Sequence, residues 1–348
     1  MTGSPLRRLR ALRREAFLFT VLLFPVSLRG QFANDAMSSF ARDTQQVAYA
    51  NYAQLRSSPD YPQLHNRILN RQLRYFQDFL RATGVDPDKD VDEVMLGWRG
   101  EAAGTTGFFG LAQGRFQPDK VRAYYAESQL PVQSYAGTDL YAFGSGQDPG
   151  DVFFTFLDTS RAAFGPLADL KALLDVRQGS ANGLDTNPSF SSWENELEGT
   201  APQWGIINGK AAANLAAGWF TAGPPTASPG SGRTTERGSG SQGGLGSSGD
   251  LSALLSPVRA VLYRVEWDGG FSSHLALICQ DDASAATLLK LISLLQAASQ
   301  QPAANSASTS SVSSILQSME AHQSGSRVEL SVSGPMDALD QVLGSTLR

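Results

Sequence analysis

The acidic run at residues 86–93 is the segment of this sequence whose side chains could most readily do chemistry. It reads Asp-Pro-Asp-Lys-Asp-Val-Asp-Glu, and alternating carboxylates of this kind can converge on a calcium ion. An EF-hand loop also needs glycine at its sixth position and glutamate at its twelfth, but those positions hold Val91 and Gly97. Asp-Pro is typical of turns in which carboxylates accept backbone N–H groups. We therefore expect a turn after a helix that ends at Gly84, with Asp90 accepting backbone hydrogen bonds.

Other catalytic and metal-binding patterns are missing from the sequence. It contains no G-x-S-x-G motif, no serine three residues before any lysine, and no phosphate loop between a strand and a helix. The three histidines, His65, His274 and His322, are too far apart along the chain to form a zinc motif, and we expect His322 near a helix end. The sequence therefore predicts no catalytic, cofactor-binding or metal-ligating residue, and no cofactor.

Dispersed carboxylates leave one catalytic alternative open. The paired acids of a hydrolase meet in space and need not be neighbours in the sequence. Asp88, Asp90 and Asp92 are the candidates for such a site, whereas the glutamates between 194 and 198 have the pattern of a solvated helix end.

Aromatic side chains and the one cysteine have simpler explanations in core packing. Cys279 follows the apolar residues 275–278, so we expect a small buried hydrophobe that forms no intramolecular disulfide. The phenylalanines of three predicted strands are also expected in the core, because aromatic rings bury large areas. They are Phe108, Phe109, Phe153, Phe154 and Phe156.

The elements that must position these residues follow from hydrophobic periodicity and from cap and turn signals. The clearest are a hairpin turning at Asp268-Gly269-Gly270, a helix beginning at Pro118, and a helix capped by Asp281 or Asp282. Strands are predicted over 45–52, 93–98, 107–113, 132–135, 139–143, 152–157, 203–208, 258–267, 271–280 and 327–333. Helices are predicted over 62–83, 118–128, 167–176, 188–197, 210–220, 282–298 and 311–321, and from Pro335 onward.

This order of elements predicts an α+β fold with antiparallel sheets, helices packed on one face, and two related copies. The first unit is expected at 45–200 and the second at 201–348. Residues 222–250 consist mainly of Gly, Ser, Thr and Pro, too poor in apolar area to fold alone. We interpret them as a flexible low-complexity excursion within the second unit.

The N-terminal 30 residues have the pattern of an export signal. Five arginines between Arg7 and Arg14 precede the apolar segment 16–28, as in the basic and apolar regions of a signal peptide. The segment is shorter than the roughly 20 apolar residues of a spanning helix, and no small-x-small cleavage site follows it cleanly. We expect an exported protein that is periplasmic, secreted or anchored to the inner membrane by 16–28, and we leave open whether the segment is cleaved.

Composition narrows the possible partners. The 348 residues are 41% hydrophobic and 18% charged, with a formal net charge of −5. This charge argues against nucleic acid as a partner, because phosphate binding needs a basic surface.

One segment carries a family resemblance. Residues 84–94, Gly-Val-Asp-Pro-Asp-Lys-Asp-Val-Asp-Glu-Val, resemble a segment of uncharacterised exported bacterial proteins with duplicated α+β units. The resemblance extends over about 45–220 and includes residues 97–100, Gly-Trp-Arg-Gly. It implies a duplicated α+β fold and carries no catalytic residue.

Together these observations predict an extracytoplasmic binding or scaffolding protein more readily than an enzyme. Its partner would be an envelope protein or ligand, with membrane contact only through the N-terminal segment. The alternative is a cell-envelope hydrolase with a site assembled from dispersed carboxylates.

Overall fold

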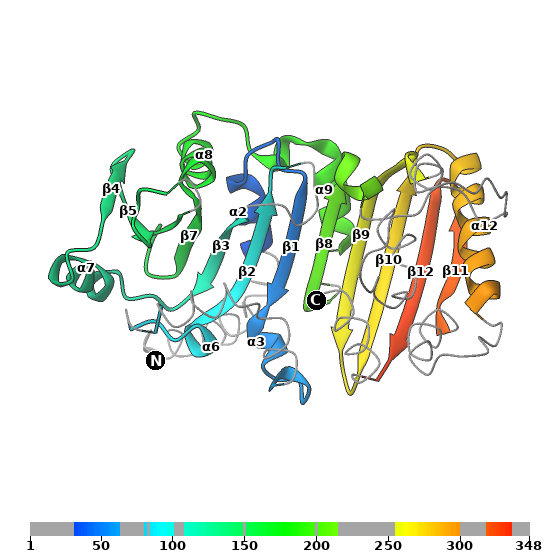
Figure 1. Ribbon diagram of the computed structural model, residues 1–348, viewed down its shortest axis with the longest axis horizontal. Helices are drawn as coiled ribbons and strands as arrows, with labels where there is room; N and C mark the ends of the chain where they lie inside the picture. The colour runs from blue at the N-terminus through cyan, green and yellow to red at the C-terminus, as the bar shows by residue number, and fades with distance from the viewer. Residues whose placement is uncertain are drawn as a thin grey trace, which may run out of the picture.

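The computed structural model describes residues 31–62, 80–81, 84–100, 108–148, 151–197, 199, 201–214, 255–299 and 318–335. In these ranges twelve strands form one antiparallel sheet, in the order β11-β12-β10-β9-β8-β1-β2-β3-β7-β6-β5-β4 (Figure 1). The strands are β1 Gln46–Asn51, β2 Val91–Trp98, β3 Phe109–Gly114, β4 Val132–Tyr135, β5 Thr138–Phe143, β6 Val152–Phe156, β7 Arg161–Pro166, β8 Gln203–Asn208, β9 Val258–Trp267, β10 Phe271–Cys279, β11 Glu320–Ser324 and β12 Arg327–Gly334.

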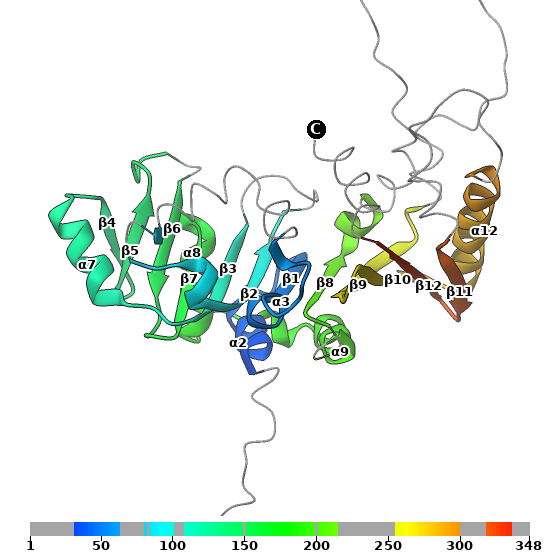
Figure 2. The same ribbon diagram turned by 90° about the horizontal axis from the view of Figure 1, so that it is seen from below.

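Helices lie on both faces of this sheet. Figure 2 shows α2 and α9 below it, whereas α12 packs at the opposite side of the β9–β12 end. The helical elements are α2 Gln31–Ser39, α3 Tyr52–Leu55, α6 Pro87–Asp90, α7 Pro118–Glu127, α8 Leu167–Arg177, the 3-10 helix η2 Leu184–Thr186, α9 Pro188–Leu197 and α12 Asp282–Ser299. The predicted α+β class with antiparallel strands is therefore confirmed, and the helices are distributed over both faces, not one.

Alternation along the strands separates the apolar residues into clusters on the two faces. On one face, residues of α2, α8 and α9 pack against the sheet, and Leu262 of β9 belongs to this first cluster. The neighbouring Val261 points to the other face, where a second cluster includes Leu288 and Ile292 of α12. A third cluster lies with α7 and includes Val121, Tyr125 and aromatic residues of β5 to β7.

The two predicted units meet at the centre of the sheet. β1 pairs with β8 over five residues, from Gln46 opposite Ile207 to Ala50 opposite Gln203. Moving outward, β2 and β3 follow on one side, and β9 and β10 follow on the other. The strands therefore form one continuous sheet, and the internal duplication stays a prediction.

Most predicted elements are confirmed with shifts of one or two residues, but one boundary in the second half of the chain is wrong. Of the helix expected over 311–321, residues 311–317 lie outside the described residues, and the last two residues belong to the edge strand β11 Glu320–Ser324. β7 and α2 were not predicted at all. The predicted export segment at 16–28 and the low-complexity segment 222–250 lie outside the described residues, as do most of the expected helix 62–83 and the expected helix after Pro335. Among the described helices, none is long and apolar enough to cross a membrane.

Candidate functional site

A hollow in the sheet surface originates from the small residues of β3. Phe109 and Leu111 point into the first apolar cluster and are almost completely buried. Gly110 and Ala112 face the opposite side, because side chains alternate along a strand. A Cβ on Gly110 would lie 2.7 Å from Cζ of Phe164, so glycine lets this ring approach the strand. At Gly110 and Ala112, the largest side-chain group that β3 has on this face is a methyl group.

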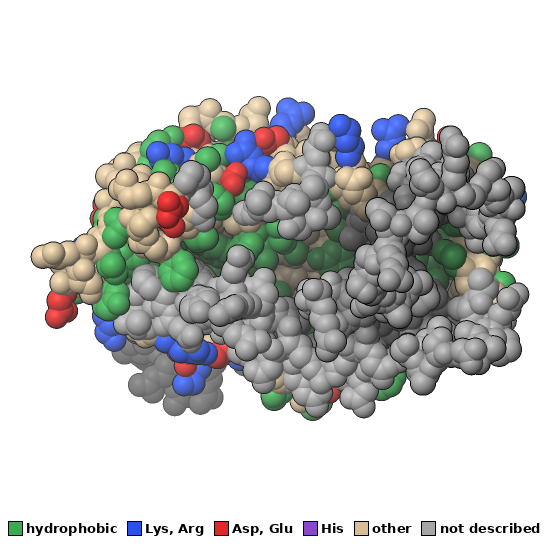
Figure 3. All heavy atoms as spheres, viewed as in Figure 1, with side chains coloured by type: hydrophobic (Ala, Val, Ile, Leu, Met, Phe, Trp, Pro, Cys, Tyr) green, Lys and Arg blue, Asp and Glu red, His purple; other side chains and the backbone are tan. Residues whose placement is uncertain are grey.

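Larger apolar side chains stand around the hollow and enclose a cavity of about 150 Å³. β7 contributes another small residue, Ala162, directly opposite Ala112. Neighbouring phenylalanine rings of the wall have centroids 5.8 to 6.2 Å apart. The other described apolar lining residues are Leu80, Val85, Pro87, Val91, Val94, Leu96, Phe108, Phe116, Phe154, Phe156 and Phe164. Figure 3 shows hydrophobic side chains gathered on this face of the molecule, over the end of the sheet that contains β2, β3 and β7.

Two residues with polar groups complete the described lining, Tyr52 of α3 and Asp88 of α6. The Asp88 side chain is 30% exposed, so the cavity reaches the surface beside α6. Its Oδ2 lies 2.5 Å from Nη2 of Arg81. Burial raises the pKa of the Tyr52 hydroxyl, and the negative charge of Asp88 raises it further. The described lining is therefore apolar except for a neutral phenol and a carboxylate.

The acidic run beside the cavity is explained by local structure. Asp86 is the N-cap of α6, and its Oδ1 accepts a hydrogen bond from the Asp88 N–H at 3.2 Å. Pro87 occupies the first turn, where a missing N–H has no consequence. Asp90 accepts a 2.8 Å hydrogen bond from the backbone N–H of Asp86, as predicted. A hydrogen bond from Lys89 lowers the pKa of Asp86. The run therefore caps and begins a short helix, and no group of three or more potential ligands in the described residues is arranged to hold a metal.

The three hydrolase candidates are held by different partners. Only Asp88 lines the cavity. Asp92 forms a 2.8 Å ion pair with Arg56, and Asp90 lies 4.0 Å from Arg115. These contacts orient the carboxylates toward separate arginines.

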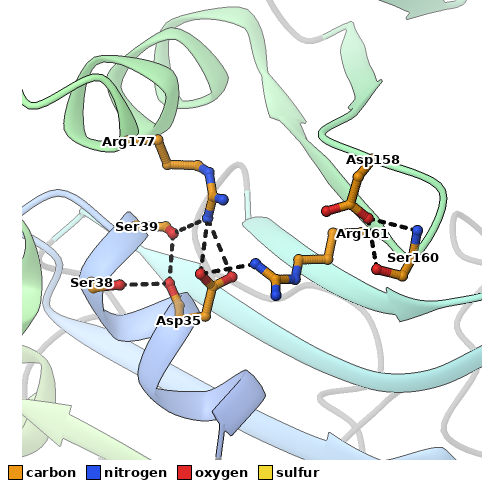
Figure 4. Close-up of polar contacts among 7 residues, drawn as sticks. All are labelled: Asp35, Ser38, Ser39, Asp158, Ser160, Arg161 and Arg177. Atoms are coloured by element: carbon orange, nitrogen blue, oxygen red, sulfur yellow. Dashed lines mark hydrogen bonds and ion pairs between the residues drawn. The ribbon is translucent and has the colours of Figure 1, made fainter.

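A second polar cluster lies on the face that carries α2 and α8. Figure 4 shows Asp35 of α2 between Arg161 of β7 and Arg177 of α8. The closest distances from the carboxylate to these two guanidinium groups are both 3.2 Å. Arg177 also donates a 2.7 Å hydrogen bond to Ser39, which is 1% exposed. One carboxylate therefore connects α2 to a strand and to a neighbouring helix, which is a structural role.

Two sequence predictions about single polar residues need correction. His322 was expected near a helix end, but it lies in β11 and its Nε2 is 2.9 Å from Glu329. Glu194 was expected in a solvated helix end, but it is 4% exposed. The side chain of Glu196 in the same helix is 41% exposed, as predicted, and it forms an ion pair with Arg327 of β12 at 2.6 Å. These contacts depend on strands that are distant in the sequence.

Cys279 is the buried hydrophobe that the sequence predicted. It is 5% exposed and belongs to the second apolar cluster. Burial, with a further contribution from Asp281, raises the pKa of Cys279 to about 11. Such a thiol is protonated at neutral pH and is a poor nucleophile.

The aromatic prediction is confirmed for Phe109, Phe153 and Phe154, which are buried in apolar clusters. Phe108 and Phe156 are partly buried against the third cluster, and together with Phe154 they also line the cavity. The signal that could have revealed the cavity is the alternation of small and large residues in β3.

Comparisons with known proteins add no functional information. No family model and no curated protein matches the chain. Crystal structures of TP0453 in crystal forms III and I are similar at 10% and 11% sequence identity, each with a TM-score of 0.47. The alignments cover 90% of this chain and 98% and 97% of the two TP0453 chains.

Proposed function

We propose that this protein is an extracytoplasmic binding protein that holds an apolar molecule in the cavity between β2, β3, β6 and β7. The observation that carries the proposal is the hollow over Ala112 and Ala162, which is surrounded by phenylalanine rings. A cavity lined in this way is poor in partners for water, and one of about 150 Å³ can hold a benzene ring. The N-terminal pattern of arginines followed by 16–28 supports the extracytoplasmic location.

The volume of the cavity limits how much of a ligand it can hold. About 150 Å³ accommodates a ring or a short stretch of alkyl chain, and the rest of a larger molecule would emerge beside the partly exposed Asp88. The hydrolase alternative is not part of the proposal, because Asp88, Asp90 and Asp92 are directed to separate arginines.

Binding of the neutral dye phenylnaphthylamine, whose fluorescence rises in apolar surroundings, tests the proposal. We expect saturable binding to the native protein and at least tenfold weaker binding to Ala162→Leu, whose added carbons would occupy the cavity. Ala163→Leu is the matched control, because Ala163 is the next residue of β7 and points into the first apolar cluster. Equal dye binding by Ala162→Leu and the native protein would refute the proposal.

A saturating ligand should also stabilise the fold. Binding to the folded state alone at 100 times Kd adds about 2.7 kcal/mol, which corresponds to a rise in Tm of roughly 5 °C for a protein of this size. Differential scanning fluorimetry with an apolar ligand can detect such a shift in the native protein and its absence in Ala162→Leu.

A further inference from the structure

We propose that the polar end of the ligand is neutral or cationic and that the cavity discriminates against anionic head groups through Asp88. This inference rests on the proposed function and names the ligand class: an alkyl or aryl group bearing a hydroxyl or an amine in preference to a carboxylate or a phosphate. Asp88 is the one charged residue among the described residues that line the cavity.

The position of Asp88 is fixed by α6. Asp86 caps this helix and Pro87 follows it, which places Asp88 in the first turn. Arg81 holds Asp88 at 2.5 Å and is also 3.8 Å from Asp86. The charge of Arg81 is thus divided between two carboxylates.

Apart from Arg81, two nearby cations pair with carboxylates outside the described cavity lining. The Lys89 side chain is 79% exposed and its Nζ lies 3.0 Å from Asp86. The Arg115 side chain is 71% exposed and lies 4.0 Å from Asp90. Neither belongs to the described lining. The negative charge of Asp88 also acts on the Tyr52 hydroxyl: burial raises the pKa of this group, and Asp88 raises it further.

A carboxylate has lone-pair positions for about four hydrogen bonds, so Asp88 can accept from a ligand donor while it binds Arg81. A hydroxyl or an ammonium group supplies such a donor. A ligand carboxylate supplies none, and at a separation of about 4–6 Å its repulsion by Asp88 is worth about tenfold in affinity near a partly exposed surface.

Displacement of phenylnaphthylamine by octanol, octylamine and octanoate at pH 7 tests this inference, because the three share one alkyl chain and differ in head-group charge. We expect octanoate to require at least tenfold higher concentrations than octanol or octylamine. Anions are also better hydrated than alcohols, and this difference alone would weaken octanoate binding. Measurements on the native protein therefore cannot assign the effect to Asp88, and a variant is needed. We define the ratio as the concentration of octanoate that displaces half of the dye divided by the corresponding concentration of octanol. In Asp88→Asn this ratio should fall at least fivefold.

Two further variants make the outcome specific to the cavity. Asp119→Asn is the matched control, because Asp119 follows Pro118 in the first turn of α7 as Asp88 follows Pro87, and it pairs with Arg122 at 2.9 Å. It lies outside the described cavity lining and should leave the ratio unchanged. Arg81→Gln should increase the ratio, because it removes a positive charge that is paired with Asp88, and it provides the test if Asp88→Asn does not fold.

The outcomes separate the two proposals. Dye binding with equal displacement by octanol and octanoate would overturn the head-group inference and leave the proposed function intact. A ratio that is unchanged in Asp88→Asn and Arg81→Gln would also overturn the inference. Absence of cavity-dependent dye binding would overturn both.

Discussion

Adding side-chain volume at two neighbouring residues of β7 should change the stability of the protein in opposite directions. Ala162 lines the cavity and is opposite Ala112 of β3. Ala163 is 0% exposed, is opposite Leu111, and packs in the first apolar cluster. Because both residues belong to one strand, leucine at either position has the same effect on strand propensity, and the difference reports on the space that each side chain meets.

The expected magnitudes follow from burial and packing. Ala162→Leu adds three carbon atoms, which contribute about 2.4 kcal/mol at about 0.8 kcal/mol per buried methylene, less about 0.5–1 kcal/mol for lost side-chain freedom. The cavity has room for them, since about 150 Å³ holds a ring of six carbons. We expect Ala162→Leu to gain about 1.5 kcal/mol. Ala163→Leu should lose about 1–3 kcal/mol, because an already packed core must rearrange.

Thermal and urea unfolding of the ligand-free proteins can measure these changes. A gain of about 1.5 kcal/mol raises Tm by roughly 3 °C, and the loss in Ala163→Leu lowers it by roughly 2–6 °C. If both variants lost the same stability, the space over Ala162 would already be filled, and the argument for a ligand cavity would fail.

Two other predictions concern single side chains outside the cavity. Burial raises the pKa of Cys279 from 9.0 to about 11, so iodoacetamide at pH 8 should alkylate the native protein about 100-fold more slowly than the urea-unfolded chain, and comparable rates measured by mass spectrometry would contradict its burial. Asp281 caps α12 by accepting a 2.8 Å hydrogen bond from the Ser284 N–H, and this bond is the main cause of its lowered pKa. The stabilisation is therefore present above the unfolded-state pKa of Asp and is lost as pH falls through the folded-state value. Asp281→Ala should lower Tm at pH 7 and match the native protein at pH 2, whereas a deficit independent of pH would indicate another cause.

Local signals predicted the elements whose ends carry caps or tight turns. The hairpin of β9 and β10 turns through Gly269, whose φ of +66° favours glycine. Pro118 begins α7, and Asp281 directly precedes α12. Each of these features depends on residues within a few positions of one another, which is why the sequence was sufficient.

The missed elements depend on tertiary contacts. β7 reads Arg-Ala-Ala-Phe-Gly-Pro, and alanine, glycine and proline are depleted in strands. It is stabilised as a strand by pairing with β3 and β6. β11 is a polar edge strand, Glu-Ala-His-Gln-Ser, with one sheet neighbour, β12. Its hydrophobic pattern is too weak to distinguish a strand from the end of a helix.

The cavity illustrates the same limit. Gly110, Ala112 and Gly114 occupy alternate positions of β3, so a face without large side chains could have been recognised from the sequence. That Ala162 lies opposite Ala112 could not, because β7 was not predicted and lies beside β3 although β4, β5 and β6 come between them in the chain.

A crystal structure of the native protein soaked with bromobenzene would test the central claim most directly, because the anomalous signal of bromine locates the ring. We predict a bromine peak in the cavity, close to Ala112, Phe154 and Phe164, and no such peak in Ala162→Leu. A native crystal in which the cavity is filled by protein side chains, or in which bromobenzene binds only elsewhere, would contradict the account.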